Sequence, residues 1–188
     1  MNLSKTTAVV ALILGAGIVT VFSESCSKKS NAAAAPMTLY DSLGGSVMVA
    51  DPANSGQMVE KGYLGIRTVV DSAIFIIAGD TAINGYFKVL ISEVSSGNLS
   101  GYQRLSTNLS TFIAVAVGAK DYTYTGLSMH DAHNPSTNPR ITMTVASDDF
   151  TEFVTDVAAS ATKNGLPSYL ISRLGTVLFS VESLVVQR

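Results

Sequence analysis

Both histidines of this 188-residue chain lie in one short run, Tyr124-Thr125-Gly126-Leu127-Ser128-Met129-His130-Asp131-Ala132-His133. Because the two imidazoles are three residues apart, a helix would place them on the same face. In helical proteins an imidazole beside an apolar pocket is the usual ligand of a haem iron. The main question about this chain is therefore whether His130 or His133 lies beside an apolar pocket.

Three interpretations of the pair stay open at this point. A histidine on a helix is most often a surface residue or a hydrogen-bonded core residue. A zinc or copper site would need about four ligands, whereas the chain has one cysteine, Cys26, and near the histidines only Asp131 is acidic. A single axial haem ligand needs one histidine and apolar walls, which the rest of the chain would have to supply.

The overall composition is that of a folded globular chain. It is 47% hydrophobic and 14% charged, with a net charge of -2, which is unlike a disordered protein. A near-neutral balance argues against nucleic acid as a partner, because phosphate binding needs a basic surface. The length suits one domain with a real core and an additional N-terminal segment.

The N-terminal segment has the pattern of an export signal. Lys5 precedes an apolar run at 8–22, which is short for a membrane span and normal for a signal-peptide core. Cys26 follows this run and has no second cysteine to pair with. Its position resembles a bacterial lipoprotein signal, in which this cysteine would carry the lipid. Ser23 and Ser25 depart from that pattern, since leucine and a small Gly or Ala are usual there.

We therefore expect a lipoprotein-type signal at 1–26, a tether at 27–37 and one globular domain at 38–188. Simple secretion after cleavage near 33–35 and an uncleaved anchor are the alternatives. Each of the three places the domain outside the cytoplasm, either periplasmic or on the cell surface. The first makes the protein a lipoprotein anchored to the membrane through lipidated Cys26.

Hydrophobic periodicity in the domain predicts an all-α fold with short links. Helices are expected over about 64–78, around 105–116, from the acidic pair Asp148-Asp149 to a cap at Gly165, and finally over 170–181. Residues 46–62 contain Asp51-Pro52 and Gly56 and are interpreted as turn and loop. A brief extended stretch is considered at 142–145.

From Thr38 onward the chain resembles the group I truncated haemoglobins. The matching pieces are, in chain order, Thr38-Leu39-Tyr40-Asp41-Ser42-Leu43-Gly44-Gly45, Val69-Val70-Asp71, Tyr86-Phe87, Arg104-Leu105 through Phe112-Ile113, Tyr124-Thr125-Gly126 with Met129 and Ala132-His133, and Phe150 onward with Asn164-Gly165-Leu166-Pro167. The resemblance implies a truncated globin, a two-over-two helical sandwich that binds haem b through its iron.

The resemblance also implies roles for individual residues. His133 would be the proximal ligand of the haem iron, while His130 would face the haem rim or solvent. The other residues implied to contact the haem are Met129 below the porphyrin, Tyr86 and Phe87 at its edge, Phe112 and Ile113 in the pocket wall, and Tyr124 near the haem carboxylates. The chain departs from the family pattern in three places. The first departure is the insertion at 46–62. The second is Leu127, which stands where the family has an arginine.

The third departure concerns the side of the haem that would bind a gas. Ile74 and Leu109 occupy the positions of the family's distal Tyr and Gln, and neighbouring Leu105 is also apolar. Asn108 or Tyr86 is the remaining candidate for a hydrogen-bond donor. We therefore expect reversible binding of a diatomic gas, O2, CO or NO. The alternatives are an enzyme that detoxifies NO or peroxide with an external reductase, and a globin-fold binding module without haem.

Overall fold

The computed structural model describes residues 37–188, so the expected signal at 1–26 and nearly all of the tether lie outside the described residues. The described part is mostly helical, which confirms the all-α prediction. Its elements are α1 (Leu39–Ser42), β1 (Met48–Ala50), β2 (Met58–Glu60), α2 (Lys61–Gly79), the 3-10 turn η1 (Asn84–Phe87), α3 (Lys88–Ser95), α4 (Ser100–Ala116), α5 (Met129–His133), α6 (Ser147–Lys163), α7 (Ser168–Phe179) and α8 (Glu182–Val185).

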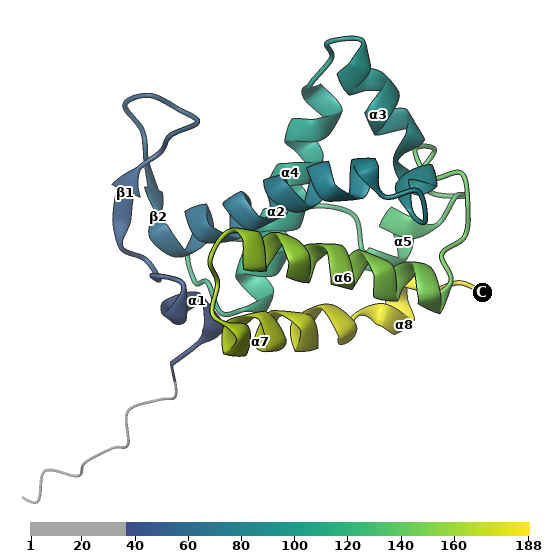
Figure 1. Cartoon of the computed structure of the whole chain (residues 1–188). Helices are drawn as coiled ribbons and strands as arrows, with labels where there is room; N and C mark the ends of the chain where they lie inside the picture. The colour runs from purple at the N-terminus through teal and green to yellow at the C-terminus, as the bar shows by residue number, and fades with distance from the viewer. Residues whose placement is uncertain (1–36) are drawn as a thin grey trace, which may run out of the picture. The chain divides into compact units, whose positions relative to one another are not determined.

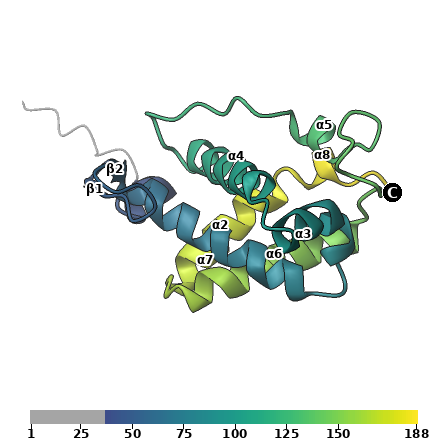
Figure 2. The same cartoon turned by 90° about the horizontal axis from the view of Figure 1, so that it is seen from above.

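Four long helices form the two-over-two sandwich. α2 packs against both α4 and α6, and α6 lies beside α7. The two views agree that α2 runs through the middle of the molecule, with α6 and α7 stacked on one side of it and α4 on the other (Figures 1 and 2). The short α5 sits at the end of this sandwich, next to α8.

The sequence of α2 explains its central position. Ile66, Val70, Ala73, Ile74 and Ile77 are all buried, as the helical period predicts. Their β-branched side chains favour strands in isolation, but an apolar stripe of this length is buried best as a helix between helices. The length of α2 and its mean hydropathy of 1.4 would also suit a membrane span. Here its apolar faces are covered by α4 and α6, as in the core helix of a globular domain.

The insertion at 46–62 is a β-hairpin, so the prediction of loop alone is wrong for its two strands. β1 and β2 pair antiparallel, with Val49 opposite Val59. Asp51 organises the connecting turn by accepting the backbone N–H of Ala53 at 2.9 Å. The same carboxylate accepts hydrogen bonds from the guanidinium of Arg67 on α2, which fastens the hairpin to the sandwich.

Two further differences from the sequence-based expectation concern the later helices. α3 was not anticipated, because its eight residues are too few to show a clear period. The last helix ends at Phe179 rather than continuing through Val181, and the chain turns before α8. The expected extended stretch at 142–145 reduces to one bridge between Val145 and Val186, where the N–H of Gln187 donates to the Val145 carbonyl at 2.8 Å.

Candidate functional site around His133

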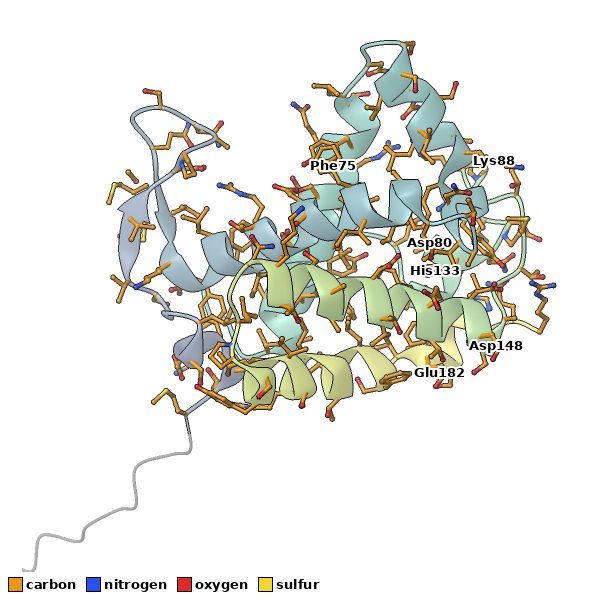
Figure 3. The ribbon with its side chains drawn as sticks, in the orientation of Figure 1. Phe75, Asp80, Lys88, His133, Asp148 and Glu182 are labelled. Carbon is orange, nitrogen blue, oxygen red and sulfur yellow. The ribbon has the colours of Figure 1, made fainter. Side chains whose placement is uncertain are left out.

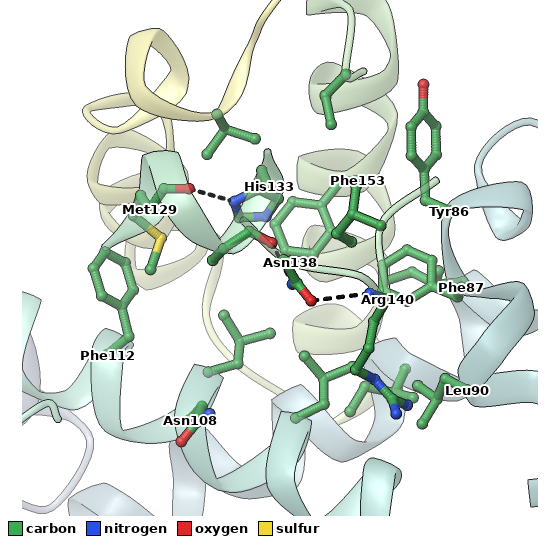
Figure 4. A pocket seen from close by; sticks show the side chains of 18 of the residues that line it. Tyr86, Phe87, Leu90, Asn108, Phe112, Met129, His133, Asn138, Arg140 and Phe153 are labelled. Atoms are coloured by element: carbon green, nitrogen blue, oxygen red, sulfur yellow. Dashed lines mark hydrogen bonds between the residues drawn. The ribbon is translucent and has the colours of Figure 1, made fainter. Parts of the chain in front are cut away.

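A cavity of about 280 Å³ lies at the end of the sandwich that carries α5. Its walls come from nearly every element between α2 and α8 and are mainly aliphatic and aromatic (Figure 4). The polar side chains that reach it are few: Tyr86, Arg104, Asn108, Tyr124, His133, Asn138, Arg140 and Asp149. Such a lining suits a mostly apolar ligand oriented by a small number of polar groups.

The structure brings the sequence-predicted site residues together, with one exception. Those that line the cavity are Ile74, Tyr86, Phe87, Leu105, Leu109, Phe112, Tyr124, Met129 and His133. Ile113 does not line it and is only 2% exposed. Ile113 instead borders a smaller void between α2, α4 and α7, together with Ile66 and Val70. One residue along a helix turns the side chain by about 100°, so Phe112 and Ile113 face different parts of the core, and the pocket assignment of Ile113 is corrected.

The imidazole of His133 has a fixed orientation. Its Nδ1 lies 2.8 Å from the main-chain carbonyl oxygen of Met129. Because a carbonyl only accepts hydrogen bonds, Nδ1 carries the proton, and Nε2 is left with its lone pair. The ring borders the cavity between Met129 and Asn138 (Figure 4). Burial lowers the pKa of His133, and the bond to Met129 only partly opposes this shift. His133 is therefore neutral at pH 7 and able to ligate a metal.

Side chains from two other segments hold α5 in place. A five-residue helix leaves most of its carbonyl groups without an internal partner. The amide of Asn138 donates to the Ala132 carbonyl at 2.6 Å, and the amide of Gln187 donates to the His133 carbonyl at 2.8 Å. These bonds join α5 to the following loop and to the C-terminal tail, so His133 is positioned from both sides.

An ion pair fastens the loop that follows α5 to α3. The guanidinium of Arg140 makes two hydrogen bonds to the Glu93 carboxylate on α3, at 2.7 and 2.6 Å. These hydrogen bonds, together with the positive charge of Arg140, lower the pKa of Glu93. A Cβ at position 101 of α4 would overlap this carboxylate, so Gly101 gives the ion pair its space. Arg140 also lines the cavity, and the pair therefore fixes one of its walls.

The second histidine is arranged differently. His130 is exposed and does not border the cavity; its Nδ1 lies 3.3 Å from the neighbouring Asp131 carboxylate. Tyr124 does border the cavity, with its ring edge-on to Phe112 at 5.5 Å. Its hydroxyl donates to the Leu127 carbonyl at 2.8 Å. The proton of Tyr124 is therefore used within its own loop and is not directed at a ligand.

The cavity lining on α2 and α4 is largely apolar, and its polar side chains are Arg104 and Asn108. Ile74, Leu105 and Leu109 present only hydrocarbon to the space that they line. Tyr86 is excluded as a donor because its hydroxyl hydrogen-bonds to Asp149 and points away from His133 (Figure 4). Asn108 remains as an exposed amide on the lining of α4.

Several residues that line the cavity or support α5 were not predicted from the sequence. Phe153, Asn138 and Arg140 come from α6 and the loop after α5, and their place in the cavity follows from tertiary packing. Gln187 supports α5 across 54 residues of sequence, which no local pattern reveals. Arg104 was noted only as part of a matching segment, although its four-residue spacing from Asn108 on α4 could have placed it beside that residue.

Comparison with known proteins agrees with this architecture. No protein family matches the sequence, and no curated protein matches it either. Among solved structures, three crystal structures of single-residue variants of the truncated haemoglobin from Tetrahymena pyriformis, all in the Fe(III) form, match with a TM-score of 0.57. They are 15% identical to the chain and cover 80% of it and 99% of their own length. The chain therefore has the truncated-globin fold.

Proposed function

We propose that the protein is a haem-binding globin that reversibly binds a diatomic gas, O2, CO or NO. The observation that carries this proposal is the oriented imidazole of His133, whose Nδ1 donates to the Met129 carbonyl at 2.8 Å beside a mainly apolar cavity. A half-buried histidine arranged in this way leaves Nε2 free for a metal, and the hydrogen bond from Nδ1 sets its tautomer.

The residues around the cavity fit haem b. Phe87, Phe112 and Phe153 supply flat aromatic walls, and the rest of the lining is mainly aliphatic. Haem also carries two carboxylates that need water or a cation. Arg104 and Asn108 are exposed on the α4 part of the lining and suit that need. One nitrogen ligand in apolar surroundings fits a haem iron better than zinc, which requires about four ligands.

When bound, the haem iron would supply the site for the gas. The chain's own residues would determine how firmly the haem and the gas are held. His133 would hold the iron through Nε2, and the hydrogen bonds that Asn138 and Gln187 donate to α5 keep its ring in position. The mainly apolar walls disfavour water in the cavity. Ile74 and Leu109 offer no hydrogen-bond donor to a gas in the cavity. O2 gains more from such a bond than CO does, so the affinity for O2 would be lower than in a pocket that has a donor.

A second candidate is an enzyme that detoxifies NO or peroxide with an external reductase. Peroxide cleavage is assisted by an acid-base group near the reacting oxygen atoms. Among the described residues, the one carboxylate that lines the cavity is Asp149, which is already hydrogen-bonded to Tyr86 and paired with Arg188. Ile74, Leu105 and Leu109 cannot transfer protons. This composition favours reversible binding over that enzyme. A haem-free binding module would give no role to the orientation of His133.

The location is proposed from the N-terminal sequence. The apolar run at 8–22 followed by Cys26 supports an extracytoplasmic domain anchored through a lipidated cysteine. Expression in a bacterial host, membrane fractionation and mass measurement test this directly. We expect the chain in the membrane fraction with a lipid-modified Cys26, and a Cys26→Ala variant without the lipid. An unmodified wild-type chain would contradict the proposed anchor.

Haem binding is tested with the full chain and two matched variants. Titration with haem should produce an intense absorption band at the blue edge of the visible spectrum, saturating at one haem per chain. His133→Ala should bind haem far more weakly and with an altered spectrum, whereas His130→Ala should behave as the wild type. An absent band, or equal spectra for wild type and His133→Ala, would overturn the proposal.

A further inference from the structure

Three carboxylates meet where the C-terminal end of α2 lies against α6. Asp80 directly follows α2, and Glu152 and Asp156 lie one turn apart on α6. One oxygen from each side chain lies within 4.8 Å of one from each of the others. Figure 3 marks Asp80 at this junction. The cluster is separate from the His133 cavity, whose lining does not include these three residues.

The burial of Asp156 makes this cluster more than a group of surface acids. Asp156 is 7% exposed, and its Oδ2 is fully buried without a hydrogen-bond partner. Asp80 has the same feature: its Oδ1 accepts the N–H of Ala82 at 2.9 Å, while its buried Oδ2 has no partner. Leaving ionised carboxylate oxygens buried and unpaired is strongly unfavourable. Two such atoms in one cluster call for a proton or a positively charged group between them.

The local electrostatics point to the same need. Like charges four residues apart on a helix repel each other, as Glu152 and Asp156 do. The C-terminal end of α2 adds the negative end of a helix dipole beside Asp80. Among the described residues, none of the three carboxylates forms an ion pair with a basic side chain. Burial, followed by the charges of Asp80 and Glu152, raises the pKa of Asp156.

We propose that Asp80, Glu152 and Asp156 bind one hard divalent cation, of the Ca2+ or Mg2+ class. Carboxylate oxygens are the ligands these ions prefer, and water completes their coordination. The cation would satisfy both unpartnered oxygens and fasten the end of α2 to α6. Ile83 and Phe153, which follow Asp80 and Glu152 closely in sequence, line the His133 cavity, so this junction also supports its wall.

A proton shared between carboxylates is the competing explanation for this geometry, and cation titration separates the two. The full chain, freed of metal with a chelator, is titrated by calorimetry with CaCl2 and with MgCl2 at neutral pH. Thermal unfolding is then measured with each salt against KCl of matched ionic strength. We expect saturable binding of one cation per chain and a melting temperature that rises with its concentration.

The variants assign the binding to these residues. Asp156→Asn and Asp80→Asn should each weaken cation affinity by roughly tenfold or more, because affinity depends on the charge of the ligand set. Asp148→Asn is the matched control: it removes one exposed carboxylate from the first turn of α6 and should leave the affinity unchanged.

Two results would overturn the proposal. One is the absence of saturable binding together with equal melting temperatures in divalent salts and KCl. The other is unchanged affinity in Asp156→Asn or, if that variant fails to fold, in Asp80→Asn, which alters a less buried position. Because these measurements use the chain without haem, neither outcome depends on the function proposed for His133.

Discussion

The Nδ1 atom of His133 donates to the main-chain carbonyl of Met129, one turn earlier in α5, at 2.8 Å. This bond distinguishes the two histidines of the chain. It fixes the ring of His133 and leaves its Nε2 unprotonated, whereas His130 lies in solvent beside Asp131. The site thus depends on one oriented imidazole, and the spacing of the two histidines is incidental.

The first prediction concerns the titration of His133 in the chain without haem. In a His130→Gln variant it is the only imidazole, and we expect its resonances to titrate below the usual pKa of about 6.5, because burial lowers this pKa. A lowered pKa in the folded state means that stability is fully present above about pH 6.5 and declines as the pH falls through the folded pKa. NMR titration measures the value directly, and a result at or above the usual pKa would contradict the burial of this ring.

The second prediction concerns the apolar lining on α4 and rests on haem binding. Leu109→Gln places a donor there, and a hydrogen bond to iron-bound O2 of about 1.5–3 kcal/mol should slow O2 dissociation by roughly 10–100-fold. Leu109→Met is the control, since it keeps the volume without adding a donor. Stopped-flow displacement of O2 by CO measures the rate. Slow O2 release from the wild type, unchanged in Leu109→Gln, would show that another donor already acts.

The third prediction tests the packing at the start of α2. A Cβ at Gly62 would lie 2.9 Å from the ring of Tyr40, which is 2% exposed, and 3.1 Å from the carbonyl oxygen of Gly45. Neither can move freely, so Gly62→Ala should destabilise the fold by about 1–3 kcal/mol.

Gly65→Ala is the matched control in the same helix. Its nearest new neighbour would be 3.9 Å away, so the gain in helix propensity should stabilise the fold by roughly 0.5–1 kcal/mol. Urea unfolding measures both variants. Equal effects of the two substitutions would contradict the close contact between α1 and α2.

The fourth prediction concerns the attachment of the hairpin in acid. The hydrogen bond from Arg67, followed by those from the side chain of Asn54 and the N–H of Ala53, holds the pKa of Asp51 far below its usual range. This contribution to stability is present above the unfolded-state pKa of about 3.9 and is lost as the pH falls toward the folded value. Asp51→Asn should therefore be less stable than the wild type at neutral pH.

The difference in stability between Asp51→Asn and the wild type should narrow as the pH falls below about 4. Thermal unfolding at a series of pH values measures it, and taking the difference removes the contribution of the other carboxylates. A difference in stability that stays constant through the acidic range would show that the Arg67 contact does not depend on the charge of Asp51.

Much of the fold could be predicted because the long helices carry their own period. The buried face of α2, with Val70 and Ile74, follows from spacing alone. The hairpin was missed because its three-residue strands are short and its turn residues dominate the pattern. α3 was missed for its length, and its link to the loop through Glu93 and Arg140 spans 47 residues of sequence.

The candidate site was predictable to the extent that its residues repeat along helices. Met129 and His133 lie one turn apart, and Leu105, Leu109 and Phe112 share a stripe of α4. That same stripe led to the wrong placement of Ile113, because adjacent residues on a helix face different directions. The supports of His133 come from Asn138 and Gln187, which only the folded chain brings to α5.

The most direct test of the account is the resonance Raman spectrum of the ferrous, gas-free protein loaded with haem. The account predicts an iron–imidazole stretching band that shifts when the histidines carry a heavy nitrogen isotope. This band should persist in His130→Ala, disappear in His133→Gly, and return when free imidazole is added to His133→Gly. A band that survives in His133→Gly without imidazole, or that is absent from the wild type, would contradict the assignment of His133 as the iron ligand.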